Sequence, residues 1–450
     1  MSAAPGRTGS PSAARRVAGQ VPAVRRVAGR LVTGRAGPAV LSQGVVAVSG
    51  LVLQLVAART LGLTGYGAYV LCFGVLVTVT AVFTGFVGDS LTVLDRFDPR
   101  VRSALVTAAA AGIAAGAVLD GAVAGVVDGG GVAAGAAFAA ATAVWLAREV
   151  GRRVLMARLA FWRLVVADSV AVVATLAALT GILLADRSAG LSGIFAAMAV
   201  GNAAAALVAN ALLPRAECRV PAPGVSGLRS VAAFAVWRSL QVGLRPATLV
   251  VVRLLVAATG GLAAVGLLEA GRLILAPVQT VVNSAGSVLL SGGAAARRAG
   301  RTASVWTRRA AVLLVGASVA GGLVGAVFAG PVGNLVIDRP APAGLVLGWA
   351  GFLAVAAATL PYATEVTVHV RSRTVFAIRF GDSLTAVALV AVLAAAGLGV
   401  AWVPWSMAAA GAVWFAVLYR VASRLRRASA GAPPDPAVPA PAAPGAGWTT

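Results

Sequence analysis

The chain has 450 residues, of which 59% are hydrophobic and only 11% are charged, against roughly 25% charged residues in ordinary soluble domains. This composition excludes a soluble globule and fits a chain whose solvent is lipid. The net charge is +23, and all 37 basic residues are Arg. Without Lys the chain has neither a P-loop nor the Schiff-base residue of a pyridoxal enzyme. Two Cys and one His argue against a disulfide framework and a His-based metal site, and we expect no cofactor.

The apolar runs predict twelve membrane-spanning helices, because a bilayer core of about 30 Å takes roughly 20 residues of helix. The predicted fold class is therefore an all-α polytopic membrane protein with two six-helix bundles. The fourth run is short and needs either a thinned bilayer or continuation into the amphipathic stretch behind it. The predicted spans are 38–58, 67–88, 103–126, 132–147, 164–185, 190–213, 234–258, 262–290, 310–329, 343–363, 376–397 and 400–420.

Between and around these spans the polar stretches divide the chain into five parts. A tail rich in Ala, Pro and Gly cannot bury enough apolar surface to fold. The parts are a basic cytoplasmic tail at 1–37, an N-terminal six-helix bundle at 38–213, a central cytoplasmic linker at 214–233, a C-terminal six-helix bundle at 234–421 and a disordered cytoplasmic tail at 422–450.

The distribution of Arg predicts the orientation, because loops rich in positive charge stay in the cytoplasm. Most Arg residues fall in alternate segments, and the loops on the other side hold only Arg59, Arg187 and Arg339. This pattern places both termini in the cytoplasm of a multi-pass protein of the plasma (inner) membrane. The dominance of Ala, Gly, Val and Arg is typical of a bacterial GC-rich genome.

Two pairs of landmarks indicate an internal duplication. In one pair, Glu149 followed by Asp168 is matched by Glu365 followed by Asp382, about 215 residues further along the chain. Ala57-Ala58 leads into Gly65-Tyr66-Gly67, and Ala257-Ala258 leads through Gly260-Gly261 into Val265-Gly266-Leu267, an offset of about 200 residues. Two halves of the same orientation enclose a cavity between their bundles.

Charged residues inside the seventh and eighth spans need partners, because each Arg at a helix centre costs about 2.5 to 3.5 kcal/mol. Arg238, Gln241 and Arg245 share one face of the seventh span. The eighth span returns from the outer side and brings Glu269 to the depth of Arg253, which predicts an ion pair between these two residues.

Arg272 reaches a depth comparable with that of Arg245, and two interpretations of the buried arginines follow. In the first, Arg245 and Arg272, with Arg253 and Gln241 as further candidates, face the cavity and bind an anionic group such as a pyrophosphate. In the second, they pair with Glu269 or with backbone carbonyls and only lock the bundle.

The remaining acids give weaker signals. Asp120 lies near the outer end of the third span and is, with Glu269, a candidate ion-pair or coupling residue, although an acid at the interface is more commonly just solvated. Asp168 and Asp382 lie near the cytoplasmic ends of their spans, where capping of a helix N-terminus is the favoured role.

Several segments resemble the polysaccharide and O-antigen flippases of the multidrug, oligosaccharidyl-lipid and polysaccharide (MOP) exporter superfamily. Together with the twelve spans, the resemblance covers roughly residues 36 to 425. The segments that carry it are Ala57-Ala58-Arg59-Thr60-Leu61-Gly62 with Gly65-Tyr66-Gly67-Ala68-Tyr69, then Arg148-Glu149, Arg152-Arg153, Arg158 and Asp168, and finally Gly271-Arg272 to Pro277.

The resemblance implies two six-helix bundles that alternate between inward and outward openings and flip a polyprenyl-diphosphate-linked glycan across the membrane. The partners it implies are this anionic lipid-linked substrate, membrane lipids and proteins of polysaccharide synthesis or polymerisation; no nucleic acid partner is expected. The chain departs from the lipid II flippase branch by lacking two further C-terminal helices and by having no Lys.

Two alternatives stay open. A small-molecule or drug exporter of the same fold would favour buried acids facing the cavity, whereas the charges deep in these spans are mainly Arg. A non-transporting scaffold of a polysaccharide synthesis complex would tolerate the loss of Arg245 and Arg272. We expect no enzyme activity, because the common catalytic motifs are missing and the outer loops are short.

Overall fold

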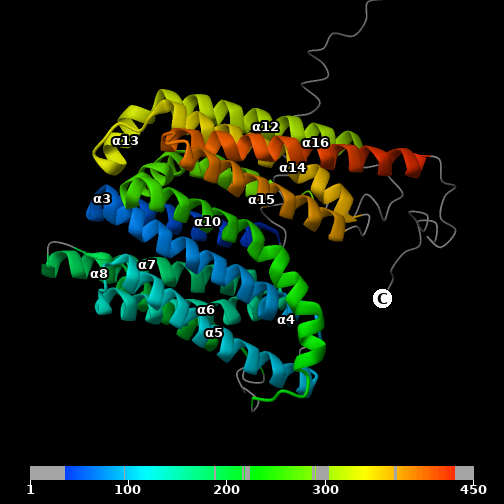
Figure 1. Ribbon diagram of the computed structural model, residues 1–450. Coiled ribbons are helices and arrows are strands. Elements are labelled where there is room, and N and C mark those ends of the chain that lie inside the picture. Colours follow the sequence, from blue (N-terminus) through cyan, green and yellow to red (C-terminus); the bar gives the residue numbers. More distant parts are fainter. Residues whose placement is uncertain are drawn as a thin grey trace, which may run out of the picture.

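The computed structural model describes residues 36–95, 97–186, 189–214, 217, 223–285, 289, 304–368 and 372–430. Within these residues every regular element is a helix, which confirms the predicted all-α fold class (Figure 1). The first half holds α3 (Ala36–Phe83), the π-helix η1 (Thr84–Gly88), α4 (Asp89–Val93), α5 (Pro99–Val127), α6 (Val132–Ala157), α7 (Phe161–Asp186) and α8 (Leu191–Ala211). The second half holds α10 (Leu228–Ile274), α12 (Ser304–Val327), α13 (Ala329–Ile337), α14 (Ala343–Val368), α15 (Ser372–Ala395), the 3₁₀-helix η2 (Val400–Trp402) and α16 (Val403–Ala430).

Two helices of double length, α3 and α10, each contain a sharp break at one glycine. Gly62 has φ 65° and ψ −179°, and Gly261 has φ 73° and ψ 176°. A positive φ costs glycine little and strains other residues, so each break reverses the chain and turns one helix into two spans. The loop predicted between the first two spans is thus a one-residue break. The two glycines are about 200 residues apart, which is the offset predicted for the internal duplication.

Nine helices among the described residues are long and apolar enough to cross a membrane, and two of them contain these breaks. Helix α6 is not among the nine, because Arg148, Glu149, Arg152 and Arg153 follow its apolar start. It continues to Ala157, beyond the predicted end at 147. Of the two alternatives for the short fourth span, the structure therefore shows the one in which the helix continues into the amphipathic stretch.

Other predicted boundaries shift for a similar reason. Helix α10 begins at Leu228, inside the predicted linker, and α16 continues to Ala430, so the predicted disordered tail is wrong for residues 422–430. Hydropathy sets a boundary where the apolar run ends, but Ala, Leu and Arg continue a helix beyond it. Residues 1–35 and 431–450, which contain most of the predicted tails, lie outside the described residues.

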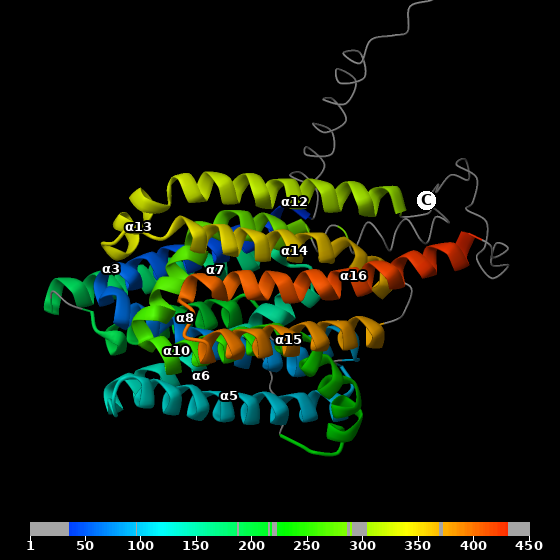
Figure 2. The same ribbon diagram turned by 45° about the horizontal axis from the view of Figure 1, so that its top comes forward.

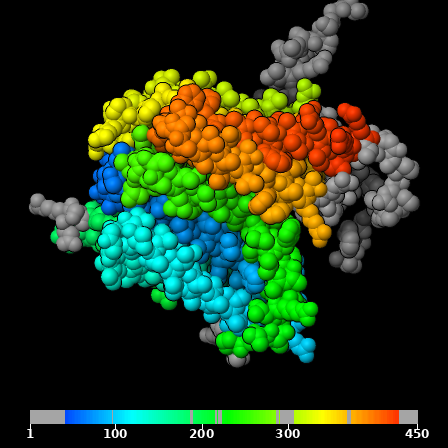
Figure 3. Space-filling view, viewed as in Figure 1, coloured from blue at the N-terminus to red at the C-terminus, as the bar shows by residue number. Residues whose placement is uncertain are grey.

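The two halves meet along α3 and α10. In the space-filling view the green residues of α10 lie between the blue and cyan first half and the orange second half (Figure 3). The contact is closest near the two breaks: a Cβ added to Gly67 would lie 1.9 Å from the carbonyl oxygen of Leu262, and one added to Gly266 would lie 2.2 Å from that of Leu63. Backbone therefore touches backbone, with each half using the equivalent glycine.

An ion pair joins the halves at this same end of the molecule, here called the break end. Arg59 Nη1 at the end of the first leg of α3 lies 2.6 Å from Asp338 Oδ1, which directly follows α13. Both side chains are largely exposed, at 45% and 77%. The pair is a surface contact, so we attribute the close approach of the two halves at the break end to the glycine packing and not to this ion pair.

Candidate functional site

A buried charged cluster lies on the two legs of α10. Glu269 is 1% exposed; its Oε1 lies 2.8 Å from Arg253 Nη2 and its Oε2 lies 2.5 Å from Arg272 Nε. The predicted ion pair between Arg253 and Glu269 is thus present. The two residues stand equally far in sequence from the break at Gly261, so the reversal of the helix brings them side by side.

This cluster faces the first half of the molecule. A Cβ added to Gly74 of α3 would lie 2.3 Å from Arg253 Nη1, so the guanidinium rests on bare backbone. Arg272 Nη1 also donates to Gln279 Oε1 at 3.2 Å. The Glu269 carboxylate thus forms ion pairs with two arginines at the contact between the halves. The cluster of three residues therefore carries a net positive charge.

Arg245 is the third predicted arginine, and its surroundings differ. Its side chain is exposed and its guanidinium lies 5.7 Å from the ring centroid of Phe352, a cation–π contact between α10 and α14 within the second half. It forms no ion pair with another described residue. Among its charged neighbours, Arg379 and Asp382 of α15 have the largest electrostatic effect on it, followed by Arg272. The structure therefore brings Arg245 and Arg272 into electrostatic range, not into contact.

A cavity of about 790 Å³ opens between the halves at the end opposite the breaks, here called the cavity end. Its walls come from both halves, and Gln241, a predicted cavity residue, is among them. Within the described residues the lining ends at Gln241, one helical turn before Arg245. The lining residues are Asp89, Thr92, Val93, Ala233, Phe234, Trp237, Arg238, Gln241 and Arg373.

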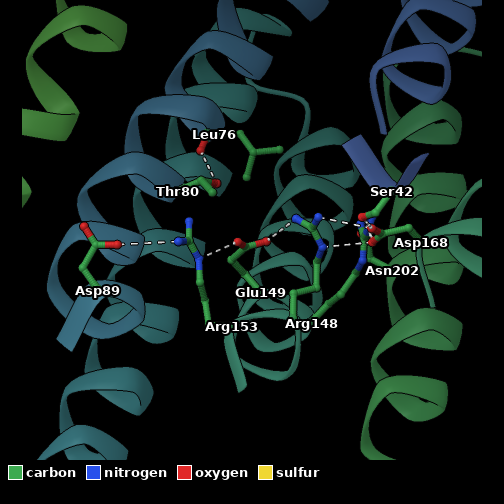
Figure 4. A network of polar contacts seen from close by, with 10 residues as sticks. Ser42, Leu76, Thr80, Asp89, Arg148, Glu149, Arg153, Asp168 and Asn202 are labelled. Atoms are coloured by element: carbon green, nitrogen blue, oxygen red, sulfur yellow. Dashed lines mark hydrogen bonds and ion pairs between the residues drawn. The ribbon is translucent and has the colours of Figure 1, made fainter. Parts of the chain in front are cut away.

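An ion pair spans the cavity wall. Arg238 Nε of α10 donates to Asp89 Oδ2 of α4 at 2.5 Å, and Arg153 Nη1 lies 3.5 Å from the other oxygen of Asp89. Figure 4 shows Asp89 facing Arg153, which in turn contacts Glu149. The cavity end is therefore tied into the charged network of the first half.

That network has Asp168 at its centre, fully buried on α7 (Figure 4). Its oxygens accept hydrogen bonds from Arg148 Nη2 at 2.6 Å and Ser42 Oγ at 2.7 Å, and Arg152 Nε lies 2.9 Å away. Arg148 also donates to Asn202 at 2.7 Å. Contacts of this buried carboxylate thus join α3, α6 and α7, and Arg148 extends the network to α8.

The capping role predicted for Asp168 and Asp382 is wrong. Helix α7 begins at Phe161 and α15 at Ser372, so each acid lies beyond the first turn, where capping ends. Sequence analysis left open whether the charged stretch after residue 147 continues the helix, as it does in α6. It therefore could not place Arg148 and Arg152 opposite Asp168.

Asp120 is also buried instead of solvated. It is 0% exposed on α5, and its Oδ2 accepts a hydrogen bond from Thr142 Oγ1 of α6 at 2.7 Å. The other oxygen has no hydrogen-bond partner among the described residues. The described part of the chain also places no cationic side chain within salt-bridge distance. Its position near a helix end suggested solvent, but α6 covers this face of α5.

Comparison with solved structures gives the fold its class. An inward-facing conformation of a multidrug resistance MATE family transporter of the MOP superfamily has a TM-score of 0.63 and 15% sequence identity, and the match covers 90% of this chain and 99% of that chain. An outward-facing conformation of such a transporter has a TM-score of 0.60 and 13% identity, covering 89% and 98%. The chain therefore has the fold of MOP-superfamily transporters.

A third similar structure is a MOP superfamily transporter from Pyrococcus furiosus, described with a binding pocket of reverse polarity that suggests a different function. Its TM-score is 0.56 at 14% identity, and the match covers 89% of this chain and 98% of that one. No protein-family model matches the sequence, and no curated protein matches it.

Proposed function

We propose that the protein is an alternating-access transporter that flips a polyprenyl-diphosphate-linked glycan across a bacterial plasma membrane. The observation that carries this proposal is the excess of arginine on the two legs of α10. Arg253 and Arg272 share the one carboxylate of Glu269, and among the described residues the ring of Phe352 is the direct partner of Arg245. A guanidinium fork suits the oxygens of a diphosphate.

The arrangement of the halves supports an inward-open state. The predicted orientation puts the cavity end in the cytoplasm and the break end outside. The halves pack backbone to backbone at Gly67 and Gly266, whereas at the other end their contact at Gly85 and Ser239 lies beside the cavity. A cytoplasmic substrate would enter past Gln241 and meet Arg245 one turn deeper. Both termini then lie in the cytoplasm, as the Arg distribution predicts.

The test is leaflet exchange of a fluorescent polyprenyl-diphosphate sugar in liposomes that contain the purified protein. We expect the wild type to exchange the lipid and Arg245→Gln to slow exchange at least about tenfold, since a charge-assisted hydrogen bond contributes about 1.5 to 3 kcal/mol. Arg229→Gln is the matched control, because Arg229 is an exposed arginine of the same helix. A wild type that exchanges no such lipid would refute the proposal.

The second candidate function is export of small molecules, which the multidrug resistance neighbours favour. A cationic drug would be repelled by the positive charges of Arg245, Arg253 and Arg272. Such repulsion disfavours binding of a cationic substrate. Uptake of a cationic dye into inverted vesicles separates the two functions. Dye transport without lipid exchange would favour the drug exporter, and neither activity would favour the scaffold.

Asp120 is the group best placed to couple transport to a proton gradient. A charged carboxylate buried with one hydroxyl partner costs several kcal/mol, whereas the neutral acid costs far less. Such a group suits proton binding and release as its surroundings change. We expect Asp120→Asn to keep the bond to Thr142 and the fold, but to abolish stimulation of exchange by a pH gradient. Full stimulation in a folded Asp120→Asn variant would exclude this role.

A further inference from the structure

A groove in the second half of the molecule lies apart from the site between the halves. It has a volume of about 760 Å³ and runs between α12 and α16 over α14. Figure 2 shows α14 flanked by these two helices, and both pack against it. Its lining combines three arginines, two tyrosines and two aliphatic side chains, namely Arg308, Arg309, Val312, Leu313, Tyr362, Tyr419 and Arg426.

The groove is amphipathic along the membrane normal. From Arg308 to the end of α12 at Val327 the helix is roughly 30 Å long, the thickness of a bilayer core, so Arg308 and Arg309 lie at headgroup level. Leu313 follows about 8 Å deeper and is 72% exposed. A molecule in the groove thus meets cations at one end and an open aliphatic wall below them.

The described residues do not balance the charge in the groove. Arg426 bonds Glu365 at 3.3 Å and lies over the rings of Tyr362 and Tyr419 at 5.6 and 5.8 Å. Arg308 and Arg309 are exposed and form no ion pair with any other described residue. Two cations without an ion-pair partner in the described part of the chain therefore lie beside an aromatic wall and can bind a ligand.

We propose that this groove binds an anionic phospholipid of the surrounding bilayer, with its phosphodiester on Arg308 and Arg309 and an acyl chain along Val312 and Leu313. Basic pockets between transmembrane helices at headgroup level are suited to anionic headgroups. The tyrosines on the opposite wall are the amphipathic side chains favoured at this depth. The site faces lipid and not the space between the halves, so it does not depend on what the protein transports.

The experiment is native mass spectrometry of the purified full-length chain in detergent, titrated with phosphatidylglycerol or phosphatidylcholine. We expect the wild type to retain phosphatidylglycerol in preference to phosphatidylcholine. Arg308→Gln with Arg309→Gln should weaken this binding about thirtyfold, taking about 1 kcal/mol for each arginine near an anionic headgroup. Equal retention of both lipids by the wild type would overturn the proposal.

Arg420→Gln with Arg424→Gln is the matched control. It removes the same charge from exposed positions of α16 outside the groove, and we expect wild-type binding. An equal loss in both double variants would mean diffuse charge attraction and would overturn the site. Displacement of the lipid by inorganic phosphate would also overturn it, since a free anion needs no aliphatic wall. Arg308→Lys with Arg309→Lys should restore much of the preference.

Discussion

Replacing Glu269 by Gln is expected to destabilise the protein by about 3 to 5 kcal/mol, the usual cost of removing one partner of a buried ion pair. Glu269 is 1% exposed and its carboxylate is shared by Arg253 and Arg272. The variant leaves two cations at the contact between the halves with a neutral amide between them. The measurement is reversible unfolding in mixed detergent micelles, which gives the free energy of unfolding.

The control changes the same chemistry at an exposed site. Asp338 lies 2.6 Å from Arg59, but the two side chains are 77% and 45% exposed. Asp338→Asn should therefore cost at most about 1 kcal/mol, as exposed ion pairs do. Equal losses for the two variants would contradict the argument that burial sets the cost.

The pair between Arg253 and Glu269 could be predicted from the sequence, whereas the network around Asp168 could not. The first prediction needed only a chain reversal and the depth of each residue along two adjacent spans. The second depends on where α6 ends, and its last turns are too charged to be recognised as a span. Helix length there is set by packing against α7 and α8, which the sequence pattern does not contain.

The burial of Asp120 is a second feature that the sequence pattern could not predict. Depth along a helix follows from counting residues, but the direction that a side chain faces depends on which neighbour covers it. Thr142 covers Asp120 only because α6 packs closely on α5 at Gly121 and Gly135, where an added Cβ would lie about 3 Å from backbone oxygen in each direction. Small residues are so frequent in this chain that no sequence pattern singles out these two.

The same reasoning gives the glycines at the break end a functional role. Closure there needs backbone contact between Gly67 and Leu262, and an added Cβ would lie 1.9 Å from the carbonyl oxygen of Leu262. Gly67→Ala must push the second legs of α3 and α10 apart. Overpacking of this kind costs about 1 to 3 kcal/mol, and the cost falls only on the conformation in which the break end is closed.

Because the penalty acts on one state, Gly67→Ala should shift the population toward the opposite state by about thirtyfold, taking 2 kcal/mol as the difference. Spin labels at Asp128 and Leu398, in a background without Cys72 and Cys218, report the separation of the halves at the break end. We expect a longer distance in Gly67→Ala. Gly50→Ala is the control on the same helix, since an added Cβ there meets nothing within 4 Å, and it should leave the distance unchanged. An unchanged distance in Gly67→Ala would mean that the two helices stay in register through the transport cycle, and the moving contact would then have to lie elsewhere between the halves.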